Sequence, residues 1–117
     1  MRPQSAKSKG RRFQQYCRDI LLKAADSLEP DDIRSTSMGA AGEDILFSPA
    51  ARRVYPYSVE CKNVEKLSIW GAIEQAVENC GKYIPVVMFK KNNHRAWIAI
   101  PLDSYMEIAH GVKKDEF

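Results

Sequence analysis

Several features that mark other protein classes are scarce in this chain of 117 residues. No apolar run approaches the ~20 residues that a membrane-spanning helix needs, and the basic first twelve residues lack the apolar stretch of a secretory signal. The three cysteines, Cys17, Cys61 and Cys80, form no Cys-x-x-Cys pair, which argues against a zinc site and a disulfide framework. The chain contains no internal repeat and no low-complexity segment. We therefore expect a cytoplasmic protein with no membrane association.

The composition is that of one globular domain with a single core, because 44% of the residues are hydrophobic and 28% are charged. The net charge of +3 does not by itself indicate a nucleic-acid partner, but the basic residues are unevenly distributed along the chain. The first twelve residues contain no acid and five basic residues: Arg2, Lys7, Lys9, Arg11 and Arg12. Such a run is typical of a phosphate-binding segment and also of a solvated end. We expect residues 1–9 to form a flexible basic arm and residues 10–117 to form the domain.

The spacing of apolar residues predicts a mixture of helices and strands. Helical periodicity predicts helices over residues 10–28, 68–80 and 101–110. Short apolar or alternating segments predict strands over residues 32–37, 44–47, 57–62, 83–89 and 96–100. Between them, residues 48–53 are predicted as a polar connection with Arg52 and Arg53 at the surface, and residues 90–94 as a basic hairpin turn. This order predicts an α/β fold with a central mixed sheet flanked by helices.

One predicted strand places an acid and a base side by side. Side chains alternate along a strand, so Glu60 and Lys62 share one face, while the neighbours on the other face are apolar. Asp44 follows a glycine-rich turn, residues 39–42, that can bring it to the same end of the sheet. We therefore expect two carboxylates and one lysine to converge.

Such a group suits the hydrolysis of a phosphodiester. Asp44 and Glu60 can hold Mg²⁺, with Mn²⁺ as a substitute, because hard divalent cations prefer oxygen ligands. The cation would lower the pKa of its water and polarise the phosphate. Lys62 can orient or deprotonate the water, or stabilise the developing negative charge. The alternative is an ordinary Glu–Lys pair on an exposed sheet face.

The spacing from Asp44 to Glu60-Cys61-Lys62 resembles the PD-(D/E)XK signature of metal-dependent nucleases, with Gly-Glu-Asp in place of Pro-Asp. Within that superfamily, residues 9–102 resemble archaeal-type Holliday junction resolvases and their phage-encoded relatives. Residues 9–12 resemble their N-terminal KG motif, residues 34–37 their serine-rich loop, and residues 59–62 their ECK strand.

The resemblance implies a restriction-endonuclease-like fold and a homodimer that makes paired nicks in four-way or branched DNA, in a bacterial or archaeal cell or a phage-infected host. The metal would be held by Asp44, Glu60 and the backbone carbonyl of Cys61. We expect DNA contacts from Lys9, Arg11, Arg12, Ser35, Thr36, Ser37, Arg52 and Arg53. Two alternatives stay open: a related nuclease that acts on nicks, flaps or ends, and a non-catalytic protein that binds branched DNA.

The chain departs from the resolvase pattern in its first helix. The family usually carries a glutamate four residues after the glycine of the KG motif, as a further metal-site acid, and here that position is Gln14. A glutamine oxygen can bind a metal or its water but adds no charge. Gln14 is therefore a possible indirect ligand, or an ordinary residue at the edge of the apolar stripe.

Overall fold

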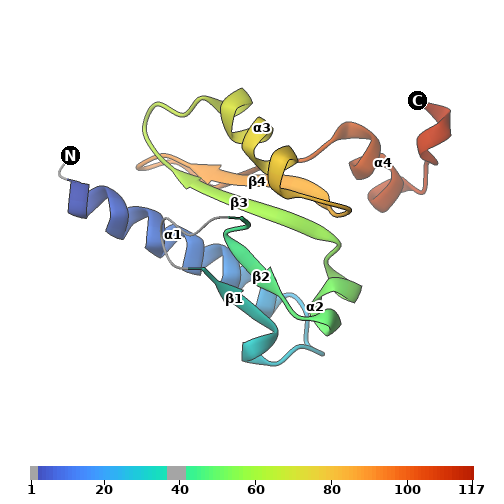
Figure 1. The fold of residues 1–117 in the computed structure, drawn as a ribbon, viewed down its shortest axis with the longest axis horizontal. Coiled ribbons are helices and arrows are strands. Elements are labelled where there is room, and N and C mark those ends of the chain that lie inside the picture. The colour runs from blue at the N-terminus through green and yellow to red at the C-terminus, as the bar shows by residue number, and fades with distance from the viewer. Residues whose placement is uncertain (1–2, 37–41) are drawn as a thin grey trace.

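Strands in two sheets form the centre of the computed structural model, which describes residues 3–36 and 42–117 (Figure 1). The first sheet pairs β1 (Ile33–Ser35) with β2 (Ile45–Phe47) in antiparallel fashion. In the second, β3 (Tyr57–Asn63) runs parallel to β4 (Ile84–Lys90), and β4 runs antiparallel to β5 (Trp97–Ala99). A parallel pair needs a crossover connection, which α3 (Ile69–Asn79) provides. The predicted mixed sheet with flanking helices is thus confirmed, although β1 and β2 form a separate small sheet.

The second sheet is covered by helices on both faces. On one face, α1 (Pro3–Lys23) contributes Leu21 to a core that includes Val59 and Val86. On the other, α3 buries Ala72 and Ala76 against Val87. Because Val86 and Val87 are adjacent in β4, they point to opposite faces of the sheet. No helix in the described ranges is both long and apolar enough to span a membrane.

Two expectations about local structure are wrong. The first helix begins at Pro3 instead of residue 10, so residues 3–9 are helical, and it ends at Lys23 instead of residue 28. Residues 49–54, predicted as a polar connection, form α2 (Pro49–Val54). Ser48 caps α2 by accepting a hydrogen bond from the backbone of Ala51 at 3.1 Å, and Pro49 occupies the first turn, where a missing N–H costs nothing.

The C-terminal helix lies where the sequence predicts it. α4 (Leu102–His110) follows Pro101 and ends at Gly111, whose φ of 68° places it in the left-handed region that favours glycine. In Figure 1, α4 and the C-terminus lie at the opposite end of the molecule from the N-terminal half of α1.

Candidate active site

Asp44 joins the two sheets. Its backbone N–H donates to the carbonyl of Val59 at 3.0 Å, and its carboxylate Oδ2 accepts from the backbone N–H of Cys61 at 2.7 Å. Its carbonyl accepts from the N–H of Thr36 at 2.9 Å, which ties it to the end of β1. The loop exit before β2 therefore places the Asp44 carboxylate against the free edge of β3.

Glu60 is almost completely buried, with 1% of its surface exposed. Its Oε1 accepts a hydrogen bond from Nδ2 of Asn79, the last residue of α3, at 3.0 Å. Burial is the main cause that raises the pKa of Glu60, and the negative charge of Asp44 and a hydrogen bond with the Asp44 carboxyl group raise it further. The hydrogen bond from Asn79 and the positive charge of Lys62 lower this pKa. The net result is a pKa of about 7. The two carboxyl groups are thus close enough to compete for one proton or to share one cation.

Lys62 completes the group that the sequence predicts. In the parallel pairing of β3 with β4, Glu60 lies opposite Val87 and Lys62 lies opposite Phe89. Because Glu60 and Lys62 are two positions apart on one strand, their side chains share the face that α3 covers. The Lys62 side chain is half-buried and forms no hydrogen bond or ion pair with any residue that the structure describes. Its charge nevertheless acts on Glu60. The acid from the loop exit and the acid–amine pair on β3 therefore converge.

Gln14 holds Asp44 from the α1 side. It is buried, with 4% of its surface exposed, and its Nε2 donates to the carbonyls of Thr36 and Asp44, at 2.8 Å in each case. Two carbonyl acceptors fix the orientation of the amide, because a flipped amide would set oxygen against oxygen. Gln14 thus contacts the backbone of Asp44, and it positions that residue whether or not its own oxygen reaches a cation.

The donor set suits a hard cation. Within residues 3–36 and 42–117, no three His, Cys, Asp or Glu side chains lie close enough together to hold a metal ion. The site therefore offers two carboxylates, those of Asp44 and Glu60, without a third side chain of these types. Mg²⁺ is commonly bound by one or two carboxylates, with waters and substrate phosphates completing the shell. In a strand, the carbonyl of Cys61 lies on the same edge as its N–H, which faces Asp44, and it offers a third oxygen. The Cys61 thiol faces away from this site. A hydrogen bond with Cys17, and to a smaller extent burial, raise the pKa of that thiol.

Arg52 differs from its predicted role. Its guanidinium forms a bidentate ion pair with Glu43, at 2.9 and 3.0 Å, donates to the carbonyl of Tyr57, and lies 3.8 Å from the ring centroid of Tyr83. The expectation that this side chain is free at the surface is therefore wrong. Arg53, one position along, is exposed as expected.

The other predicted DNA contacts fall into different environments. Arg11 and Arg12 are exposed, whereas Lys9 is buried and pairs with Glu65 at 3.0 Å. Ser35 is half-buried, and the Thr36 hydroxyl donates to the Asp44 carbonyl at 3.2 Å. Ser37 and residues 39–41 of the glycine-rich turn lie outside the described residues.

Asn79 is the site residue to which the sequence did not point. It lies at the end of α3, nineteen positions after Glu60, and no motif marks it. Its amide donates to Glu60 and, at 3.4 Å, to the carbonyl of Gly42, so it contacts the segments that carry both acids. Comparisons of the chain with known protein families, curated proteins and solved structures gave no match.

Proposed function

We propose that the chain is a Mg²⁺-dependent endodeoxyribonuclease of restriction-endonuclease-like fold that cleaves branched DNA. The observation that carries the proposal is the juxtaposition of the Asp44 and Glu60 carboxyl groups, with Lys62 on the same face of β3. Two neighbouring carboxylates repel each other unless a proton or a cation lies between them, and a divalent cation relieves that repulsion.

Each residue has a distinct task in this mechanism. Asp44, Glu60 and the Cys61 carbonyl would hold Mg²⁺, which supplies Lewis-acid polarisation of the scissile phosphate and a water of lowered pKa. Lys62 places a positive charge where negative charge develops on the phosphoryl oxygens. Asn79 fixes the orientation of Glu60 by its hydrogen bond, and Gln14 fixes the backbone of Asp44.

An exposed apolar groove supports a homodimer, which would present two sites to a junction with two-fold symmetry. The groove lies between α3, β4 and the start of α4, and its cavity measures about 330 Å³. It is lined by Trp70, which is 73% exposed, together with Val77 and Leu102, which are also exposed. Large exposed apolar side chains gathered in one groove are typical of protein–protein contacts.

The decisive experiment is cleavage of labelled DNA by the full chain with Mg²⁺, Mn²⁺ or EDTA. A four-way junction, a flap and a linear duplex are compared, because they separate a resolvase from a nuclease that acts on flaps or ends. Glu60→Gln and Lys62→Ala should abolish cleavage and leave DNA binding intact. Glu74→Gln and Lys66→Ala, at exposed positions, are the matched controls and should cut like the parent chain.

Two outcomes contradict the proposal. Cleavage by Glu60→Gln at the parental rate would show that the acid pair is not the active site. Binding of branched DNA in EDTA, with no product in either metal at any protein concentration, would instead identify a non-catalytic DNA-binding protein of this fold.

A further inference from the structure

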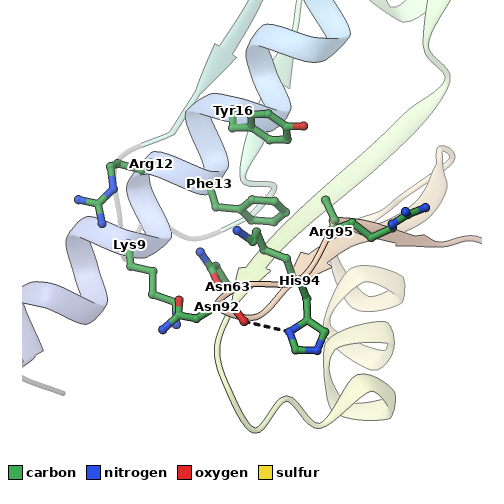
Figure 2. Close-up of a pocket in the computed structure, with 10 residues that line it drawn as sticks. Lys9, Arg12, Phe13, Tyr16, Asn63, Asn92, His94 and Arg95 are labelled. Atoms are coloured by element: carbon green, nitrogen blue, oxygen red, sulfur yellow. Dashed lines mark hydrogen bonds between the residues drawn. The ribbon is translucent and has the colours of Figure 1, made fainter.

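A second concave site lies at the end of β3, between α1 and the turn that joins β4 to β5 (Figure 2). Its volume of about 670 Å³ falls within the range of ~300–1,000 Å³ that is usual for small-molecule pockets. Asn63, which lines it, directly follows Lys62 in the chain. Side chains alternate along a strand, so Asn63 points to the face of the sheet that α1 covers, opposite to the α3 face that carries Glu60 and Lys62.

The lining is strongly cationic. Lys9, Arg12, Lys90 and Arg95 all line the cavity, and no acidic residue does. Lys9 is neutralised by Glu65, whereas the other three form no ion pair with any residue that the structure describes. Uncompensated positive charge in a concave site attracts anions, and three separate cations suit successive phosphates of a strand.

An aromatic surface lies along the α1 wall. Figure 2 shows Phe13 and Tyr16 projecting from the same side of α1. Their rings are stacked, with centroids 6.2 Å apart and planes inclined by 20°. Phe13 is buried, whereas Tyr16 is 52% exposed, so Phe13 supports the Tyr16 ring while leaving part of it accessible. A supported, accessible ring beside cations is the arrangement on which unpaired bases stack.

The two walls are tied together, and the site holds an unused acceptor. Glu65 accepts from Lys9 of α1 at 3.0 Å and from the backbone N–H of Asn92 in the hairpin turn at 2.8 Å. The side-chain oxygen of Asn63 is buried and accepts no hydrogen bond from the residues that the structure describes. Buried acceptors are usually paired, so this oxygen is an exception among the described residues.

We propose that this cavity binds one unpaired nucleotide of a DNA strand, with its base on Tyr16 and the flanking phosphates on Arg12, Lys90 and Arg95. A base inside a duplex is stacked on both faces and cannot enter. The preferred substrate would then carry an unpaired nucleotide near the scissile bond, as a flap or a gapped branch does. The substrate preference rests on the proposed nuclease function, whereas strand binding in the cavity does not require cleavage.

Binding is measured by fluorescence anisotropy with a labelled oligothymidine and the full chain in EDTA, so that no cleavage occurs. Tyr16→Ala should weaken binding by about 5-fold to 150-fold, because stacking on one aromatic side chain contributes about 1–3 kcal/mol. Tyr16→Phe should bind like the parent chain. Tyr105→Ala is the matched control, since Tyr105 is 48% exposed on α4 at the other end of the molecule (Figure 1), and should change nothing.

The phosphate contacts are tested through salt dependence. Arg12→Gln, Lys90→Gln and Arg95→Gln should each reduce the slope of log affinity against log salt concentration by about 0.7. Lys113→Gln, which follows α4, removes the same charge far from the cavity and should leave the slope unchanged. A Tyr16→Ala variant with parental affinity overturns the proposal. So does equal affinity for a duplex of the same length, which would reduce the cavity to a site for backbone phosphates.

Cleavage assays separate this inference from the proposed function. If no DNA is cut but oligothymidine binding depends on Tyr16, the nuclease proposal fails and the cavity stands. If cleavage depends on Glu60 but Tyr16→Ala cuts flaps and fully paired junctions in the parental ratio, the nuclease proposal stands and the preference for an unpaired nucleotide is overturned.

Discussion

Replacing Gln14 by glutamate tests how the structure departs from the resolvase pattern. That pattern places a metal-binding glutamate here, so the resemblance alone predicts that Gln14→Glu improves the enzyme. For the metal-free protein, the structure predicts that Gln14→Glu lowers the stability. The nitrogen that donates to the carbonyls of Thr36 and Asp44, at 2.8 Å each, would become a carboxylate oxygen facing two other oxygens.

The magnitude follows from the bonds that are lost. Each hydrogen bond contributes about 0.5–1.5 kcal/mol, and a buried acceptor left without a donor costs about 1–3 kcal/mol. Two carbonyls lose their donor, and the new charge enters a site where only 4% of the side chain is exposed. We expect the free energy of unfolding to fall by about 3–5 kcal/mol near neutral pH. The loss should be smaller in mild acid, because a protonated carboxyl group can still donate to one carbonyl.

Urea denaturation in EDTA measures this loss. Gln15→Glu is the control, since Gln15 is the next residue on α1 and is exposed, and its effect should stay within about 0.5 kcal/mol. If Gln14→Glu unfolds at the same urea concentration as Gln15→Glu, Gln14 does not hold Asp44 in the way that we describe.

Two further predictions concern the acid pair and Arg52. Folding raises the pKa of Glu60 from 4.5 to about 7, so the metal-free folded state binds the proton more tightly than the unfolded state does. The stability that this proton contributes is complete below pH 4.5 and is lost as the pH rises through about 7, a fall of about 3 kcal/mol. Glu60→Gln should remove this pH dependence in urea titrations at several pH values. Arg52→Met should cost about 2–4 kcal/mol of stability, because it leaves Glu43 unpaired and removes the cation over Tyr83. Arg53→Met should stay within about 0.5 kcal/mol by the same measurement, and equal effects of the two changes would contradict the structural role of Arg52.

The sequence predicted those parts of the fold that depend on local patterns. Alternation along β3 placed Val59 in the core and put Glu60 and Lys62 on the opposite face, and the structure agrees. Alternation is a property of neighbouring residues, so no knowledge of the tertiary fold was needed. The glycine-rich turn before Asp44 suggested in the same way that its carboxyl group could approach β3.

Features that depend on distant segments could not be predicted. Arg52 looked like a surface charge because nothing local indicates that Glu43 and Tyr83 meet its guanidinium. The cationic cavity combines residues of α1, the end of β3 and the hairpin, which are far apart in the sequence. By contrast, α2 was missed although its signals were present, since Ser48-Pro49 is a favourable start for a helix.

The two acids of the candidate site belong to different sheets. Asp44 directly precedes β2, whereas Glu60 lies within β3, and the bonds that join Asp44 to Val59 and Cys61 bridge the two sheets. Any rotation of the small sheet against the large one therefore changes the gap between the carboxyl groups.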